Sequence, residues 1–192
     1  MRRPLLILLC LAVLAGCVTS PRPAPPPATP WAERLAVLQQ ANTWQLDGRA
    51  AVAMGSQGWQ ANLIWQQSAE DSEVHLTGPF GAGSLALRLT PQGLWLNGAP
   101  PSDAVLAQVR ERLGFDPPLM HLRYWLLGVP DPDGQCSVVR NAADRAQTLS
   151  QAGWNIAYER YAPVGEDLLP DRLVLTAEGV RVRIVVDHRA GP

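Results

Sequence analysis

The segment Trp44-Gln45-Leu46-Asp47-Gly48-Arg49-Ala50-Ala51-Val52-Ala53-Met54 carries large or small apolar residues at every second position. This period of two predicts a β-strand with one face toward a core and the other toward water. A turn at Gly55-Ser56-Gln57-Gly58 follows, and a second alternating run comes after it. The inward positions predicted for the two strands are Trp44, Leu46, Gly48, Ala50, Val52, then Trp59, Ala61, Leu63 and Trp65.

The same pattern continues in both directions from this hairpin. Three helical segments are indicated by three- and four-residue spacing of apolar residues and by capping signals such as Ser102. These helices are expected at Trp31–Ala41, Asp103–Leu113 and Leu119–Leu127. Further short strands are expected at Glu73–Thr77, Ser84–Thr90, Gly93–Asn97, Ser137–Arg140, Ala146–Gln151, Asn155–Tyr161, Arg172–Thr176 and Val180–Asp187. The sequence therefore predicts a mainly β protein with helices (α+β), built on a curved antiparallel sheet whose concave face is covered by helices.

The N-terminal residues resemble a bacterial lipoprotein signal. Arg2 and Arg3 precede an apolar run that is too short to span a bilayer, and the run ends at Leu14-Ala15-Gly16-Cys17. This arrangement predicts cleavage after residue 16 and acylation of Cys17; the alternative is an ordinary signal peptide with a chance cysteine. Residues 17–30 contain six prolines and are expected to form an extended tether, and residues 31–192 are expected to form one domain.

Composition argues against several classes of function. The formal net charge of −1, without a basic cluster, makes nucleic-acid binding improbable. After cleavage and acylation, Cys136 is the only free thiol, so no internal disulfide is expected. The three histidines show no metal-ligand spacing, and no nucleophile stands in a recognised catalytic motif. We therefore expect no enzyme activity, no metal and no cofactor.

Two apolar features have no catalytic explanation. Large tryptophans stand beside Gly48, Ala50 and Ala61 on the predicted inward face, which leaves gaps unless something fills them. The helices either pack this face permanently or cover a cavity for an apolar ligand. The second feature is the tight turn Gly78-Pro79-Phe80-Gly81-Ala82-Gly83, in which Phe80 either folds back onto the sheet or contacts a membrane or partner.

Several segments together resemble the LolB family of outer-membrane lipoproteins. They are the lipobox with its proline-rich tether, Trp44–Arg49, Trp65-Gln66-Gln67, Gly78-Pro79-Phe80-Gly81, Leu122-Arg123-Tyr124-Trp125-Leu126-Leu127-Gly128-Val129-Pro130, Gln151-Ala152-Gly153-Trp154 and Leu169-Pro170. The C-terminus departs from the family, which often has Asp-x-Trp where this chain has Asp187-His188-Arg189. Phenylalanine at position 80 is a second departure, because members of the family carry leucine there.

The resemblance implies an incomplete antiparallel β-barrel with helices over its mouth and a hydrophobic cavity. It also implies a function: the domain accepts lipoproteins from the periplasmic carrier LolA and inserts them into the outer membrane. Phe80, with Pro79 and Gly81, is implied to enter the membrane. The predicted cavity wall consists of Trp44, Trp59, Leu63, Trp65, Leu76, Leu87, Trp125 and Leu126.

The expected partners are LolA, the acyl chains of cargo lipoproteins and outer-membrane lipid, with the domain monomeric, lipid-anchored and facing the periplasm. A rival hypothesis is an envelope-assembly lipoprotein whose sheet is fully packed and whose surface binds a protein. Arg123 is expected either to reach a carboxylate at the rim, which we favour, or to contact incoming cargo.

Overall fold

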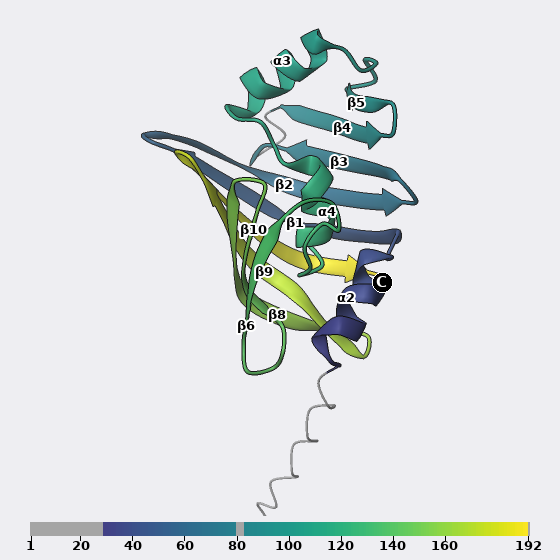
Figure 1. Cartoon of the computed structure of the whole chain (residues 1–192). Coiled ribbons are helices and arrows are strands. Elements are labelled where there is room, and N and C mark those ends of the chain that lie inside the picture. Colours follow the sequence, from purple (N-terminus) through teal and green to yellow (C-terminus); the bar gives the residue numbers. More distant parts are fainter. Residues whose placement is uncertain (1–28, 80–82, 192) are drawn as a thin grey trace, which may run out of the picture.

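The computed structural model describes residues 29–79 and 83–191, and these form one ten-stranded antiparallel sheet with three helices (Figure 1). The strand order is β5-β4-β3-β2-β1-β10-β9-β8-β7-β6, so β1 and β10 pair at the centre while β5 and β6 are the edges. The first half of the sheet contains β1 (Thr43–Met54), β2 (Gln57–Ser68), β3 (Asp71–Thr77), β4 (Ser84–Thr90) and β5 (Gly93–Leu96). The second half contains β6 (Cys136–Arg140), β7 (Ala146–Gln151), β8 (Trp154–Val164), β9 (Asp167–Ala177) and β10 (Val180–Ala190).

The predicted faces of the first hairpin are confirmed. Trp44, Leu46, Ala50 and Val52 are buried on β1, while the residues between them are mostly exposed. A β-bulge between Asp47 and Gly48 shifts the register with β10, and Gly48 fits there because it has no side chain. A Cβ at position 48 would lie 2.2 Å from the Val185 carbonyl oxygen, so the two backbones approach too closely for any other residue.

The three predicted helices are present; the helix predicted at Asp103–Leu113 has the predicted ends, and the other two end two residues earlier than predicted. They are α2 (Trp31–Gln39), α3 (Asp103–Leu113) and α4 (Leu119–Trp125). The Ser102 side chain accepts a hydrogen bond from the Val105 amide at 3.2 Å, as expected for its predicted capping role. Helix α4 ends at Trp125, and the chain then turns through Gly128, whose φ of +80° favours glycine.

The hairpin of β8 and β9 is longer than the sequence predicted. Its strands continue through Pro163 and Pro170, two residues that lack the amide hydrogen of a strand ladder. Pairing of β9 with β10 stops at Arg172 and Val185, and no register pair joins the two strands beyond these residues. The two strands therefore separate toward one end of the sheet, where each pairs only with its other neighbour.

One apolar cluster joins the inward faces of the strands to all three helices. Figure 1 shows α4 in front of the middle of the sheet, α3 beside β4 and β5, and α2 beside the C-terminus. The mainly β fold with helices and the antiparallel order are as predicted, and the sheet is open. The strands have two ends. We call the end with the β1–β2 turn, the β9–β10 turn and the β3–β4 connection the loop end, and we call the opposite end, beside α2, the α2 end.

Candidate functional site

Six of the eight residues predicted to line a cavity are buried in the described structure. Trp65, Trp125 and Leu126 are completely buried, and Trp44, Leu63 and Leu87 are at most 4% exposed. Trp44 and Trp65 stack with ring centroids 6.0 Å apart. These side chains belong to the apolar cluster, so this region is packed in the structure.

A buried polar network holds the end of α4. The indole Nε1 of Trp125 donates to Oε1 of Gln151 at 2.9 Å, and the same oxygen accepts from the Asp131 amide at 2.9 Å. Nε2 of Gln151 donates back to the Asp131 carbonyl, and Oδ2 of Asp131 lies 2.8 Å from Nδ1 of His121. Because buried polar groups are costly to leave unpaired, this network fixes α4 to β7.

Two arginines make further contacts at the α2 end. Arg34 of α2 is 3% exposed, pairs with Asp167 and donates to the Leu168 carbonyl at 2.8 Å. Arg189 of β10 donates from Nη2 to the carbonyls of Leu126 and Pro170, both at 3.0 Å. It therefore bridges the separated strands β9 and β10 and the end of α4, at a position whose role the sequence did not reveal.

Arg123 lies close to a carboxylate of the sheet. Its Nη1 is 3.8 Å from Oε2 of Glu70, in the turn between β2 and β3, and the Arg123 side chain is 13% exposed. This placement agrees with the favoured prediction that Arg123 reaches a carboxylate at the rim.

The remaining two predicted wall residues, Trp59 and Leu76, meet at the loop end. They are only partly buried, and both line a hollow of about 360 Å³ together with Ala61, Leu85 and Leu113. Gly78, Pro79 and Gly83, which flank the predicted membrane loop, line the same hollow, as do Gln60, Ser84 and Arg112. The loop end therefore has an apolar hollow that is open to the surface.

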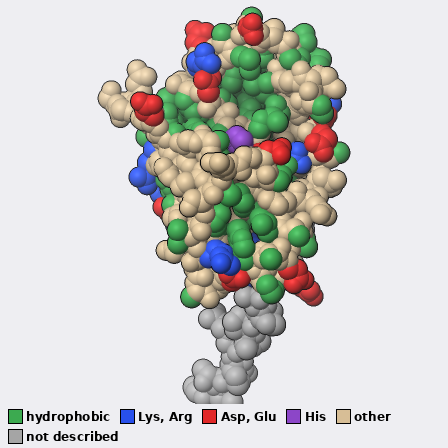
Figure 2. All heavy atoms as spheres, in the orientation of Figure 1, with side chains coloured by type: hydrophobic (Ala, Val, Ile, Leu, Met, Phe, Trp, Pro, Cys, Tyr) green, Lys and Arg blue, Asp and Glu red, His purple; other side chains and the backbone are tan. Residues whose placement is uncertain are grey.

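A side-chain hydrogen bond joins β2 to the end of α3 beside this hollow. Nε1 of Trp59 donates to the Leu113 carbonyl at the end of α3, at 3.0 Å. Gly114 follows with φ +84°, and a Cβ there would meet Met54 of β1. Figure 2 shows apolar side chains gathered on the face of the molecule that is turned to the viewer. Leu106 of α3 and Met120 of α4 are large apolar side chains that are exposed.

Several predicted residues fall outside the described part of the chain. Cys17, Phe80 and Gly81 belong to this group, whereas Pro79 is described and exposed. Within residues 29–79 and 83–191, no cluster of three or more metal-ligating side chains occurs. None of the described helices has the length and apolarity of a membrane span.

The sequence pattern missed part of the hollow's lining. Leu85 and Leu113 belong to a predicted strand and a predicted helix, but nothing in their spacing indicated that they share a hollow with Trp59. Their meeting depends on where α3 ends against β2, which is a tertiary feature.

These observations define a class of protein: an open antiparallel sheet with helices packed on one face and an apolar hollow at one end. A crystal structure of a LolA superfamily protein from Nitrosomonas europaea has a similar fold, with a TM-score of 0.52 and 11% identity, covering 86% of this chain and 94% of that one.

Sequence comparison identifies the family. The family model described as "Outer membrane lipoprotein LolB" matches residues 42–188. The outer-membrane lipoprotein LolB of Nitrosococcus oceani is 35% identical, covering 95% of this chain and 94% of that one. That of Alkalilimnicola ehrlichii is 32% identical, covering 97% and 96%. The chain belongs to the LolB family of outer-membrane lipoproteins.

Proposed function

We propose that this protein accepts lipoproteins from the periplasmic carrier LolA by taking their acyl chains into its apolar interior, and then inserts them into the outer membrane. The observation that carries the proposal is the open apolar hollow formed by Trp59, Leu76, Leu85 and Leu113 beside the β3–β4 connection. Family membership supports the outer-membrane destination.

Direct handover is required by the hydrophobic effect. Three chains of about sixteen carbons, at about 0.8 kcal/mol per buried CH₂, would cost roughly 35 kcal/mol to expose to water. Release of cargo into the periplasm is therefore far too slow, and transfer from one apolar site to another avoids that barrier. Transfer then proceeds downhill in free energy from carrier to acceptor to bilayer.

The hollow at the loop end is the entrance in this proposal. Its volume of about 360 Å³ is near the lower end of small-ligand sites, so it admits only part of a three-chain lipid. The wall residues Trp44, Leu63, Trp65, Leu87, Trp125 and Leu126 fill the interior when no cargo is present. Acyl chains that enter beside Trp59 displace α3. The sheet then becomes strongly curved and encloses a cavity.

The membrane contacts of the proposal lie at two points of the chain. Acylated Cys17 anchors a monomeric domain, residues 31–192, through the tether of residues 17–30, and Phe80 enters the bilayer between Pro79 and Gly81. The proposed mechanism uses no catalytic residue, metal or cofactor.

Transfer of cargo from a loaded carrier tests the proposal. The soluble domain from Val18 onward, without lipid, is mixed with LolA preloaded with a lipoprotein, in the absence of nucleotide. We expect the cargo to move to the domain. Cargo that stays on a competent carrier, with the domain shown to be folded, would favour the rival hypothesis of a packed protein-interaction module.

A matched pair of variants locates the entrance. Leu76→Trp fills the hollow, whereas Ile64→Trp adds the same ring to a 40% exposed position on the other face of the sheet. We expect Leu76→Trp to slow transfer at least about tenfold, the equivalent of about 1.4 kcal/mol, and Ile64→Trp to leave it unchanged. Equal rates for both variants would place the entrance elsewhere.

Two further variants separate anchoring from insertion. Phe80→Glu is expected to block delivery to membranes while acceptance from the carrier continues; equal loss of both steps would argue against a membrane role for Phe80. Cys17→Ala is expected to remove the lipid anchor. Lipid labelling of Cys17→Ala equal to that of the wild type would contradict the assignment of the acylation site.

A further inference from the structure

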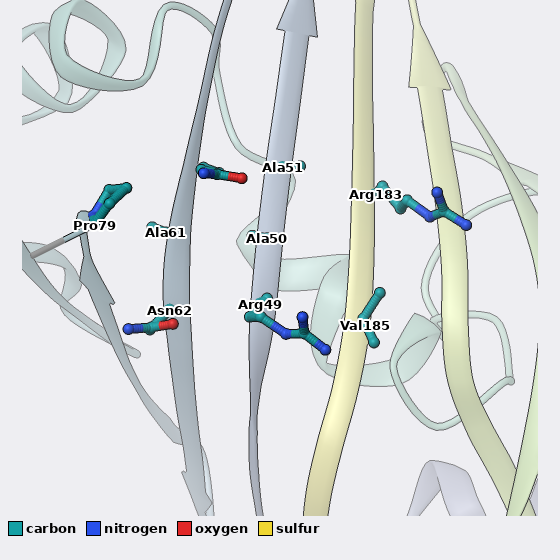
Figure 3. A pocket seen from close by; sticks show the side chains of 9 residues that line it. Arg49, Ala50, Ala51, Ala61, Asn62, Pro79, Arg183 and Val185 are labelled. Atoms are coloured by element: carbon teal, nitrogen blue, oxygen red, sulfur yellow. The ribbon is translucent and has the colours of Figure 1, made fainter.

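A second hollow lies on the outer face of the sheet, away from the helices. It has a volume of about 410 Å³ and is lined by Arg49, Ala50, Ala51, Gln60, Ala61, Asn62, Pro79, Arg183 and Val185. Figure 3 shows these residues on neighbouring strands, with the small alanines between the longer polar side chains. Because the lining has two guanidinium groups, two amides and no carboxylate, it offers mainly hydrogen-bond donors to an anion.

The strands around this hollow carry no acidic residue toward the loop end. Ala50, Ala61 and Ile184 lie at one level of the register, paired across β2, β1 and β10. From that level to the loop end, residues 50–54, 57–61, 173–177 and 180–184 include Arg181 and Arg183 but no aspartate or glutamate. Glu178, in the β9–β10 turn, is the acidic residue that follows the range 173–177 directly in sequence.

The carboxylates that pair with Arg49 and Arg183 lie on β10 and β8, further toward the α2 end, and they occupy only some of the N–H donors of each guanidinium group. Arg49 donates Nε and Nη2 to Asp187, at 3.0 and 2.8 Å, and Arg183 donates Nη2 to Glu159 at 3.1 Å. Both pairs are exposed, with the arginine side chains 62% and 48% accessible. Such pairs contribute little to stability, so the remaining N–H groups are available to a stronger acceptor.

Arg181 adds a third cation to this surface. It is exposed, and no ion pair with it occurs among the described residues. We call Arg49, Arg181 and Arg183, with Gln60 and Asn62, the outer arginine face.

The two hollows share one strand. Gln60, Ala61 and Pro79 line both, so β2 separates an apolar hollow on the helix side from a donor-rich hollow on the outer side. A bilayer surface presents the same two chemistries, acyl chains below and phosphate groups above.

We propose that the outer arginine face binds the phosphate groups of bilayer phospholipids and so turns the loop end toward the membrane. This inference rests on the proposed function, and it adds an orientation that neither the lipid anchor nor an extended tether supplies. The phosphates accept hydrogen bonds from the free guanidinium and amide N–H groups.

Solvent accessibility of a fluorescent label tests the orientation in the mature, lipidated protein. Cys136→Ser removes the free thiol, and Ala53→Cys places an environment-sensitive label at the loop end of the outer face; Gln66→Cys places it at the α2 end. The protein is reconstituted into vesicles of phosphatidylglycerol and phosphatidylcholine, and quenching by iodide is measured. We expect the label at position 53 to be shielded and the label at position 66 to remain accessible.

Charge removal then tests the residues. Each arginine near an anionic surface is worth about 1 kcal/mol, so the ratio of shielded to accessible label should fall about fivefold for each of Arg49→Gln, Arg181→Gln and Arg183→Gln. The control variant removes the same charge from exposed arginines away from the loop end, Arg88→Gln, Arg140→Gln and Arg160→Gln, and should keep the shielding. Arg181→Gln alone breaks no ion pair of the described residues, so it separates docking from folding.

Three outcomes would overturn the inference. They are equal iodide quenching at positions 53 and 66, equal loss of shielding in the control variant, and shielding produced by inorganic phosphate without vesicles, which would assign the hollow to a free anion. Cargo acceptance from LolA is measured on the same variants. Unchanged acceptance with lost shielding supports the docking role, whereas failed acceptance by the wild type would count against the proposed function alone.

Discussion

The α2 end and the loop end of this sheet are held by different kinds of contact. At the α2 end, buried polar groups tie the helices to the strands: Arg34 to Asp167, and Arg189 to the end of α4. The hydrogen bond from Trp125 to Gln151 joins the end of α4 to β7 as well. At the loop end, α3 is joined to the sheet by the Trp59–Leu113 hydrogen bond and by apolar contacts around a hollow that is open to solvent.

This difference indicates where the molecule can open. Moving α4 would leave several buried donors and acceptors without partners, each at a cost of about 1–3 kcal/mol. Moving α3 would break one hydrogen bond at a partly buried position and expose Val105, Val109 and Leu113 unless an acyl chain replaced them. This contrast supports the proposed entry of an apolar ligand at the loop end.

The largest expected effect comes from truncating the tryptophans at the two ends. Trp125→Ala should lower the free energy of unfolding by about 3–5 kcal/mol, because it empties a fully buried site and removes one of the donors to Gln151. Trp59→Ala, at a partly buried site, should cost only about 1–2 kcal/mol. Urea denaturation checks both values, and equal losses would remove the contrast between the two ends.

Conservative changes isolate the hydrogen bonds. Trp125→Phe leaves the buried oxygen of Gln151 with one fewer donor, and we expect a loss of about 1–3 kcal/mol. Trp59→Phe should cost about 0.5–1.5 kcal/mol and should speed the uptake of an apolar fluorescent probe. Thermal unfolding and stopped-flow probe binding measure the two effects; slower probe uptake in Trp59→Phe would contradict the entrance at the loop end.

Amide hydrogen exchange should show the same contrast without any mutation. The amides of α3 are expected to open at a free energy about 1–2 kcal/mol lower than those of Leu126–Val129, which follow α4. Exchange followed residue by residue under native conditions gives both values. Uniform protection of the two segments would indicate that they open together.

The smallest expected effect concerns Arg189. Burial lowers the pKa of this guanidinium from 12.5 to about 10, so the fold disfavours its charge, and this cost is relieved only as the pH rises through about 10. At neutral pH the cost offsets part of the benefit of its two hydrogen bonds. Arg189→Met should therefore change the free energy of unfolding by less than about 1 kcal/mol in urea titrations. A loss several times larger would make Arg189 the main connection between β9, β10 and α4.

Much of the fold follows from local sequence. The period of two from Trp44 to Trp65 predicted both strands and their buried faces. Successive side chains of a strand point to opposite faces, so a strand with one face on the core alternates apolar and polar residues. Ser102 predicted the start of α3 because its hydroxyl satisfies a helix amide. The sequence did not predict the hairpin of β8 and β9 beyond Tyr161, where Pro163 and Pro170 lack the amide hydrogen of a strand. Pro170 is tolerated because β9 has no register partner on β10 at that level.

The candidate site divides in the same way. The sequence by itself indicated the residue types of an apolar interior and the family, because these depend on spacing along the chain, and the lipobox at Cys17 stays a prediction. Only the tertiary structure decided that Trp59 and Leu76 share an open hollow with Leu85 and Leu113, and that Arg189 bridges β9, β10 and α4. Such contacts join residues far apart in sequence, and they depend on strand register and on where each helix ends, which no local pattern encodes.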